Sequence, residues 1–327
     1  MYLLSIFEQH LLVDAFTSPT KCVSYRCQHQ ALQLAPQQLG EFKPINLIQN
    51  ENNEEIEIDQ STRRVWLYDF VSSNDQETVP YQEAWDLQKR LMEQQLARIG
   101  KRPKDPPLYD QFVPIDVDER EYIERIESLQ GCDSIIMLQH DPVYTLGTAS
   151  DTSFIHDYDN NEDNNSRVPI VRIERGGEVT YHGPGQLTVY PILDLRGYNQ
   201  DIHWYMRALE EATLLALKKA GVIGATREDD LTGVWVSDKK IAACGVKLKR
   251  WITMHGVAIN VDIRSLDNFE GIVPCGLEGR EVTCINDVID GDRNSYTLKE
   301  FAVHMKAALG EIFGITLISS SAETLCT

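Results

Sequence analysis

The sequence predicts an α+β fold, and three observations support that class. Residues 81–99 and 201–220 have the apolar period of amphipathic helices. Several shorter stretches are continuously apolar or alternate apolar with polar residues, as strands do. Helical and strand patterns do not alternate strictly along the chain, so consecutive antiparallel strands are expected.

The chain is expected to divide into an N-terminal appendage, residues 1–62, and one folded domain, residues 63–320. Residues 1–62 show no sustained period and end in a polar run. Within the domain, a proline-rich segment near 100–130 and an Asn/Asp-rich segment near 157–166 are interpreted as insertions.

The first half of the domain begins with a strand at Val65–Tyr68, followed by the helix Tyr81–Ile99, which Gly100 ends. The apolar stripe of this helix contains Ala84, Trp85, Gln88, Leu91, Met92 and Leu96. Residues 135–147 read as a strand and a Pro-containing turn, and residues 168–173 as a further strand.

The second half begins with a glycine-rich loop, 175–187, that enters an apolar strand at 188–193. The next helix, 201–220, has Gly221 as its stop. Its predicted core-facing residues are Ile202, Tyr205, Leu209, Ala212, Ala216 and Ala220. Strand patterns follow at 235–236, 241–248 and 257–263. Thr297 and Glu300 have the spacing of a capping box, which predicts that a closing helix starts there.

Composition narrows the classes of function. A net charge of −19 over 327 residues argues against nucleic acid as a general partner, because phosphate binding requires a basic surface. The lack of a long apolar run argues against a membrane span. One span, 239–250, holds five cations (Lys239, Lys240, Lys247, Lys249 and Arg250) and no acid. It reads either as a docking surface for acidic partners or as a strand edge that lysines protect from pairing.

Seven cysteines without a CxxC pair suit neither a disulfide framework nor a zinc site, so no metal is expected. The pattern indicates a reducing compartment. Residues 1–40 contain few acids and scattered Ser and Thr, which favours an organellar leader for a mitochondrion or plastid. Arg26 is their only arginine, so a poorly ordered extension and a cytoplasmic location are the alternatives.

Four motifs carry the chemistry. RGGEVTYHGPGQL spans residues 175–187, KKIAACGVK spans 239–247, MHGVAIN spans 254–260, and IVPCGL spans 272–277. Glycines in such loops leave room for a ligand to lie against the main chain. Together and in this order, the motifs resemble the lipoyl(octanoyl)transferase family over roughly residues 65–315.

The resemblance implies a mixed central β-sheet flanked by helices, the catalytic fold of biotin and lipoate protein ligases. It also implies an acyltransferase that moves an octanoyl (or lipoyl) group from acyl carrier protein to a lysine of lipoyl domains. The expected acceptors are apo lipoyl domains of 2-oxoacid dehydrogenase complexes and the glycine cleavage H protein. No cofactor is expected.

By the same resemblance, Cys275 is the nucleophile that forms an acyl-thioester, and Lys240 is the general base that lowers the pKa of this thiol. Lys239 competes with Lys240 by sequence, but strand alternation places the two on opposite faces. His182 and His255 allow a thiol–imidazole reading, and the resemblance instead places both in the acyl pocket. The other cysteines are interpreted as packing residues, at 132, 244 and 284, or as tail residues.

The resemblance further implies which residues line the acyl pocket. They are Arg175, Gly176, Gly177, Glu178, Val179, Thr180, Tyr181, His182, Ala243, Cys244, Gly245, Gly256, Val257 and Ala258. Three other readings stay open: an ATP-dependent ligase of the same fold, an amidotransferase between lipoyl domains, and a non-catalytic binding module.

Overall fold

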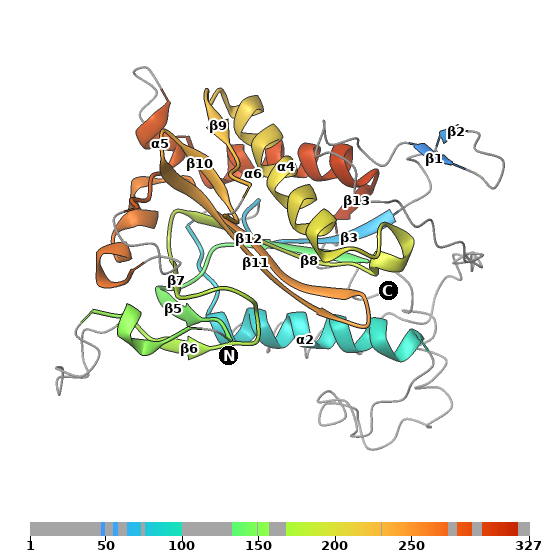
Figure 1. Cartoon of the computed structure of the whole chain (residues 1–327), viewed down its shortest axis with the longest axis horizontal. Helices are drawn as coiled ribbons and strands as arrows, with labels where there is room; N and C mark the ends of the chain where they lie inside the picture. The colour runs from blue at the N-terminus through green and yellow to red at the C-terminus, as the bar shows by residue number, and fades with distance from the viewer. Residues whose placement is uncertain are drawn as a thin grey trace.

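A mixed sheet forms the centre of the protein in the computed structural model (Figure 1). The structure describes residues 47–49, 55–57, 64–72, 76–99, 133–148, 150–156, 168–229, 231–273, 280–289 and 296–319. The expected insertions near 100–130 and 157–166 lie largely outside these residues, as does most of the expected appendage. Within that appendage, β1 (Leu47–Gln49) and β2 (Glu55–Glu57) form an antiparallel pair.

The central sheet has eight strands in the order β13-β3-β4-β8-β12-β11-β10-β9. Along the chain these are β3 (Arg64–Asp69), β4 (Ser134–Leu138), β8 (Gln186–Ile192), β9 (Ala225–Thr226), β10 (Val234–Val236), β11 (Lys239–Lys249), β12 (Ile252–Asn260) and β13 (Thr316–Ser319). β3 pairs in parallel with β13 and with β4, and the other neighbours are antiparallel. The predicted run of consecutive antiparallel strands is therefore confirmed for β10, β11 and β12.

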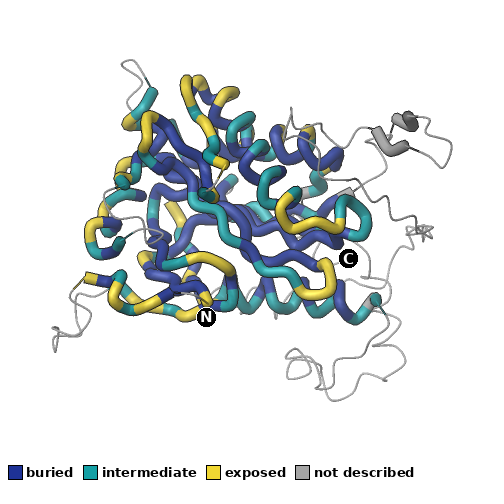
Figure 2. The backbone as a smooth tube through the Cα atoms, viewed as in Figure 1, coloured by how far each residue is buried: buried dark blue, intermediate teal, exposed yellow. Residues whose placement is uncertain are grey.

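Helices cover both faces of this sheet, as Figure 1 shows. α4 (Ile202–Ala220) and α6 (Leu298–Phe313) pack together on one face, and α2 (Tyr81–Arg98) crosses the other. Shorter elements are the helix α5 (Ile285–Val288) and the 3-10 turns η3 (Thr152–Phe154), η4 (Leu195–Gly197), η5 (Ile263–Leu266) and η6 (Phe269–Gly271). The strands between the helical layers are almost wholly buried (Figure 2).

A second, three-stranded sheet lies beside the first. It has the order β6-β5-β7, with β5 (Val143–Leu146), β6 (Ile170–Arg172) and β7 (Thr180–His182). The sequence predicted a loop over 175–187, but β7 and the start of β8 lie within that range. Glycines at 183 and 185 confine the reversal between these two strands to a tight turn.

Most residues of the predicted apolar patterns are buried, and three are not. Ile202, the first residue of α4, is 39% exposed. Ile263 is 57% exposed because β12 ends at Asn260 and η5 starts at Ile263, which ends the alternation of the strand. Trp85 of the α2 stripe is only partly buried.

The capping box at the start of α6 is confirmed. The Thr297 hydroxyl accepts a hydrogen bond from the Glu300 N–H at 3.2 Å, and the Glu300 carboxylate accepts one from the Thr297 N–H at 2.9 Å. Behind this cap, the inward side chains Phe301, Met305 and Leu309 are fully buried. Since α6 covers much of one sheet face, its first turn contributes directly to the stability of the domain.

Replacing Thr297 by alanine should lower the free energy of unfolding by about 1 kcal/mol, because the Glu300 N–H loses the hydroxyl that accepts its hydrogen bond. Urea denaturation of the wild type and the variant measures this change. Lys299→Ala, an exposed change in the same turn, is the control and should alter stability much less. Equal stability of T297A and wild type would contradict the prediction.

Candidate active site

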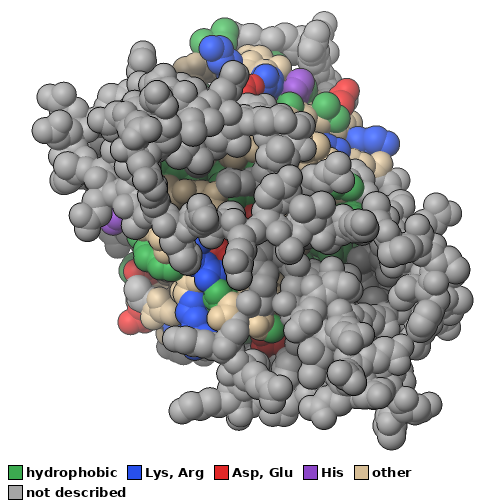
Figure 3. All heavy atoms as spheres, turned by 90° about the vertical axis from the view of Figure 1, so that its right-hand side faces the viewer, with side chains coloured by type: hydrophobic (Ala, Val, Ile, Leu, Met, Phe, Trp, Pro, Cys, Tyr) green, Lys and Arg blue, Asp and Glu red, His purple; other side chains and the backbone are tan. Residues whose placement is uncertain are grey.

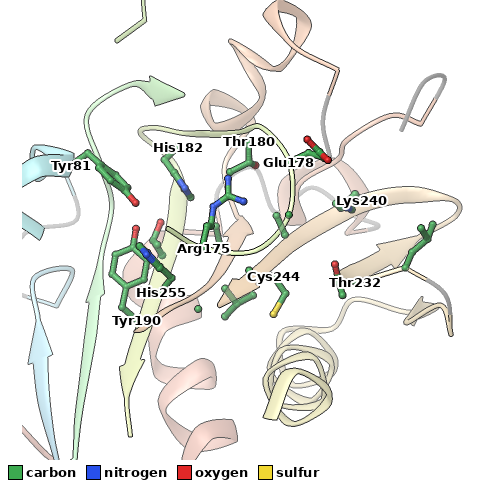
Figure 4. A pocket seen from close by; sticks show the side chains of 18 residues that line it. Tyr81, Arg175, Glu178, Thr180, His182, Tyr190, Thr232, Lys240, Cys244 and His255 are labelled. Atoms are coloured by element: carbon green, nitrogen blue, oxygen red, sulfur yellow. The ribbon is translucent and has the colours of Figure 1, made fainter. Parts of the chain in front are cut away.

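A pocket of about 210 Å³ opens between the central sheet and the loop that precedes β7 (Figure 4). Apolar surface predominates in its lining, with a few polar groups among small residues. The lining residues are Tyr81, Arg175, Gly177, Glu178, Thr180, His182, Thr188, Tyr190, Leu231, Thr232, Lys240, Ala243, Cys244, Gly245, His255, Gly256, Val257 and Ala258. The pocket thus brings together three of the four sequence motifs.

Three residues predicted for the lining lie elsewhere. Val179 and Tyr181 are fully buried in a separate apolar cluster with Phe269. Strand alternation in β7 explains this placement, because Thr180 and His182 face the pocket and Tyr181 points away. Gly176 does not line the pocket; its N–H donates to the Val246 carbonyl at 3.1 Å, and its carbonyl accepts from Arg175 at 3.0 Å.

Sequence reasoning missed five lining residues: Tyr81, Thr188, Tyr190, Leu231 and Thr232. The first belongs to α2 and was interpreted only as a helix start. Thr188 and Tyr190 alternate with core residues along β8, so their polar groups within an apolar strand were the available signal. Leu231 and Thr232 come from the loop before β10, where the sequence carried no recognisable signal.

The loop of the first motif is held across β11 by backbone contacts and by Arg175. This arginine is 8% exposed, and its guanidinium donates to the Thr145 carbonyl at 2.9 Å and to the Gly176 carbonyl at 3.0 Å. Gly245 makes the crossing possible, since a Cβ there would lie 3.1 Å from the Arg175 side chain and 3.2 Å from the Gly176 carbonyl oxygen. Glu174 and Lys247 form an ion pair at 2.9 Å beside the crossing.

His255 lies in the pocket because β12 is distorted there. Continuing the register of Val257 opposite Val189 places His255 opposite Pro191, which has no N–H to donate. His255 takes a left-handed backbone with φ 62°, and its own N–H donates instead to Gln88 of α2 at 2.9 Å. Within the described residues, neither of its ring nitrogens has a hydrogen-bond partner.

The end of the pocket opposite Lys240 is a cluster of aromatic and imidazole rings. Tyr81, Tyr190 and His255 lie together there in Figure 4. His140 supports them from behind: its Nδ1 donates to the Val79 carbonyl at 2.9 Å, so its Nε2 accepts from the Tyr190 hydroxyl at 2.7 Å. Aromatic and imidazole rings therefore surround this end of the pocket.

Burial keeps these histidines neutral. It lowers the pKa of His140 to about 4. Burial, with Arg175 nearby, lowers the pKa of His255 to about 3. Burial also holds the pKa of His182 well below its ordinary value, and burial raises that of Tyr190. The ring cluster therefore adds no charge to the pocket near neutral pH.

His182 starts a hydrogen-bonded chain that joins the motifs. Its Nδ1 donates to the Gln186 carbonyl oxygen at 2.8 Å. The Gln186 amide donates to Asn260 at 3.0 Å, and the Asn260 amide donates to the Thr283 carbonyl at 3.0 Å. The side chains of His182, Gln186 and Asn260 are all buried. Their hydrogen bonds therefore fix β7, β8 and β12 against the segment at 280–283.

Lys240 lies at the other end of the pocket and is 6% exposed. A β-bulge directs it there: Trp235 pairs with Lys240 and the preceding Val234 pairs with Ala242, so β11 has one extra residue. Lys239 points away from the pocket and forms an ion pair with Glu281 at 2.5 Å. The two lysines therefore face different sides, as strand alternation predicted.

Cys275 lies outside the described residues, which end at Val273 and resume at Arg280. Both ends of that interval are anchored. The Val273 N–H donates to the Phe154 carbonyl at 2.8 Å. Beyond the interval, the Lys240 N–H donates to the Glu281 carbonyl at 2.9 Å, and the Thr283 N–H donates to the Lys240 carbonyl at 3.0 Å.

Two other cysteines are described. Cys284 is fully buried, consistent with the packing role predicted for it. Cys244 lines the pocket, as predicted from the resemblance, and burial raises its pKa, followed by the effect of Glu210. A thiol held in its protonated form is a weak nucleophile.

The basic span 239–250 does not form one continuous surface. Lys240 is buried, and Lys239 and Lys247 are each paired with an acid. Lys249 and Arg250 are exposed at the hairpin tip. On the face seen in Figure 3, the described Lys and Arg side chains are interspersed with acidic and apolar ones.

The described residues contain no group of three or more His, Cys, Asp or Glu placed to bind a metal ion. Among the same residues, no helix is both long and apolar enough to cross a bilayer.

Comparison with solved structures places the fold. A putative lipoate protein ligase from T. acidophilum, determined with bound lipoic acid, superposes with a TM-score of 0.50 at 15% sequence identity. The match covers 81% of this chain and 92% of that one. The mixed sheet between helical layers is therefore the fold of this lipoate protein ligase.

Sequence comparison places the chain more narrowly. Residues 111–310 match the model of the lipoyl protein ligase A/B catalytic domain. The chain is 39% identical over 223 residues to the chloroplastic octanoyltransferase LIP2p2 of Arabidopsis thaliana, which covers 68% of each protein. It is 44% identical over 201 residues to the octanoyltransferase of Nostoc punctiforme, covering 61% of this chain and 83% of that protein.

The chain therefore belongs to the lipoyl protein ligase A/B catalytic domain family. Its relatives at 39% and 44% identity are octanoyltransferases, and the protein is an acyltransferase of this class. The family resemblance of the four motifs is confirmed.

Gly256→Ala should destabilise the protein by about 1–3 kcal/mol, because a Cβ would lie 2.2 Å from the Val189 carbonyl oxygen and 2.8 Å from the Pro191 ring. Gly176→Ala is the matched control in the same pocket region, since its nearest contact would be 3.8 Å away. Urea denaturation of both variants tests the difference. If both were equally stable, the close packing of β12 on β8 would be contradicted.

His140 should make the protein less stable in acid. Its pKa falls from an ordinary value near 6.5 to about 4 on folding, so below about pH 6.5 the unfolded chain binds a proton that the folded one does not. This contribution is present above pH 6.5 and is lost as the pH falls toward 4. In urea titrations over that window, His140→Gln should lose stability less steeply than the wild type; parallel curves would refute this assignment.

Proposed function

We propose that the protein transfers an octanoyl (or lipoyl) group from acyl carrier protein to a specific lysine of lipoyl domains, through a thioester on Cys275. The family and its octanoyltransferase relatives support octanoyl transfer. We further propose that acyl carrier protein is the donor, that the acyl group passes through a thioester, and that a lipoyl domain is the acceptor. Residues 63–320 are assigned as the catalytic domain.

The pocket suits an acyl chain. Ala243, Ala258, Gly245 and Gly256 leave space along its length, and its walls are mainly apolar. Each methylene transferred from water into such a space contributes about 0.8 kcal/mol. An eight-carbon chain thus gains several kcal/mol of binding free energy in such a pocket.

The position of Lys240 is the observation that carries the mechanism. Its side chain is buried in the pocket, and its backbone is hydrogen-bonded on both sides to residues that closely follow Cys275 in the chain. That pairing supports the assignment of Lys240 as the base for the Cys275 thiol. A thiolate next to an ammonium group would form a coupled pair that shares one proton.

In the first step, Lys240 takes the thiol proton and the Cys275 sulfur attacks the thioester carbonyl carbon of octanoyl-acyl carrier protein. The bond from that carbon to the carrier sulfur breaks, and the carrier leaves as a thiol with the proton from Lys240. In the second step, the neutral amine of the acceptor lysine attacks the acyl-Cys275 carbonyl. An amide forms, the bond to the Cys275 sulfur breaks, and the amine proton returns to the Cys275–Lys240 pair.

The proposed acceptors are apo lipoyl domains of 2-oxoacid dehydrogenase complexes and the glycine cleavage H protein. A related fold is known from an archaeal lipoylation system, described as a bipartite lipoate protein ligase and its E2 lipoyl domain. The relative in Arabidopsis thaliana is chloroplastic, which supports an organellar location for this protein, in the plastid or mitochondrion.

The proposal is tested by intact-mass spectrometry after the protein is mixed with octanoyl-acyl carrier protein. We expect one octanoyl adduct that maps to Cys275, is absent from Cys275→Ser, and passes to an added apo lipoyl domain without ATP. Modification of the lipoyl domain only when octanoate and ATP are supplied would instead identify a ligase and overturn the proposal.

The lysine pair provides a matched comparison in the same assay. Lys240→Met should slow adduct formation by roughly 10²–10⁴-fold, the usual effect of removing a general base. Lys239→Met should change the rate little, because this side chain is exposed and paired with Glu281 away from the pocket. Equal effects of the two substitutions would remove Lys240 from the mechanism.

A further inference from the structure

The buried indole of Trp235 contacts two cations at once. The Lys240 ammonium lies 4.6 Å from the ring centroid, and the Arg280 guanidinium carbon lies 5.0 Å from the ring. Trp235 is 1% exposed and Lys240 is 6% exposed, so their contact is shielded from water, which strengthens the attraction between a cation and an aromatic face. The Trp235 ring thus links Lys240 in the pocket to Arg280, the first residue described after the interval that contains Cys275.

The indole N–H contributes nothing to this arrangement. Among the described residues it has no hydrogen-bond partner, although buried indole N–H groups usually have one. The ring is therefore held by its faces and by packing. A purely apolar filler would serve packing equally well without leaving a buried donor unpaired, so the aromatic face is the feature that needs an explanation.

The surroundings hold Trp235 firmly in this orientation. The bulge between Val234 and Trp235 sets the ring opposite Lys240. Gly233, two residues before Trp235, has φ 119°, and its N–H donates to the carboxylate of Glu210 at 2.8 Å. Glu210 is fully buried in α4 and forms an ion pair with Arg207 at 2.7 Å.

Arg280 is fixed as well. Its guanidinium donates to both carboxylate oxygens of Glu228, at 2.9 Å and 3.3 Å. The Glu228 carbonyl accepts from Arg207 of α4 at 3.0 Å. The loop before β10, the helix α4 and the chain beyond residue 279 therefore meet around the Trp235 ring.

We propose that Trp235 is a positioning residue for acyl transfer, which holds Lys240 in its charged form and in a fixed orientation at the pocket end. This inference rests on the proposed function, in which Lys240 accepts the thiol proton and returns it to the leaving carrier sulfur. The aromatic face stabilises the protonated lysine between those two events. Trp235 itself touches neither the thioester nor the acyl chain in this scheme.

Other ionisable groups near Lys240 bear on any pH dependence. Glu178 and Cys244 line the same pocket, Arg280 shares the ring, and Glu281 bonds the Lys240 backbone while its carboxylate pairs with Lys239. A useful test must leave all of these unchanged and alter only the electron density of the ring.

Fluorinated tryptophan meets that requirement, because fluorine weakens the negative face of the ring with little change in shape. The rate of octanoyl-enzyme formation would be followed from neutral to alkaline pH in protein carrying tryptophan with increasing numbers of fluorine atoms. We expect the alkaline limb, where the Cys275–Lys240 pair loses its shared proton, to move stepwise to lower pH. The total shift should be up to about one pH unit.

The chain has five tryptophans, and Trp85 also carries a cation, Lys89, at 4.4 Å. Trp235→Phe is therefore the matched control. In this variant the other four tryptophans are still fluorinated, and the alkaline limb should no longer move. Among substitutions, Trp235→Leu should slow octanoyl-enzyme formation roughly tenfold, and Trp235→Phe should recover part of the rate because it keeps an aromatic face.

An alkaline limb that stays in place across the fluorinated series would overturn the inference, as would equal movement in wild type and W235F. A merely structural role would lower thermal stability and rate at all pH values without moving the limb. Absence of any octanoyl adduct in the unmodified wild type would overturn the proposed function and this inference together. A normal adduct with an unmoved limb would overturn the inference alone.

Discussion

The arrangement of the site depends on the backbone pairing of Lys240 with the segment 281–283. Its N–H and carbonyl bond to Glu281 and Thr283, which lie on the far side of the interval that contains Cys275. A lysine side chain alone is flexible and hydrated, but here the main chain on both sides of its Cα is fixed. The bulge in β11, the Trp235 ring and the buried Glu210 of α4 all act at this same place.

The other end of the pocket is created by a defect in the sheet. A continuous ladder between β8 and β12 would fill the space with paired backbone and outward side chains. Pro191 interrupts the ladder, and Gln88 satisfies the N–H that His255 would otherwise leave unpaired. The cost of a left-handed histidine, of order 1–3 kcal/mol, is offset by this hydrogen bond and by the packing around it. This distortion brings His255 to the end of the space between the sheet and the loop that precedes β7.

Local patterns carried much of the architecture. The helices 81–98, 202–220 and 298–313 follow from apolar periodicity with clear stop and cap signals, such as Gly221 and the Thr297–Glu300 box. Where the sequence prediction was wrong, a local pattern continued past a change in environment. Ile263 fits the alternation of β12, but the chain turns into η5 before reaching it. The strand β7 was hidden because a short strand between glycines resembles a loop.

For the site, the motifs in the sequence determined which residue types are present, and most of those placed in the described pocket indeed line it. The family resemblance selected Lys240, and alternation placed Lys239 on the opposite face, since the period of a strand is a property of the local chain. Tyr81, Tyr190, Leu231 and Thr232 could not be found in this way, because they come from three distant segments. Only the tertiary structure decided that they meet, since the packing of α2 and of the loop before β10 depends on contacts between residues far apart in the chain.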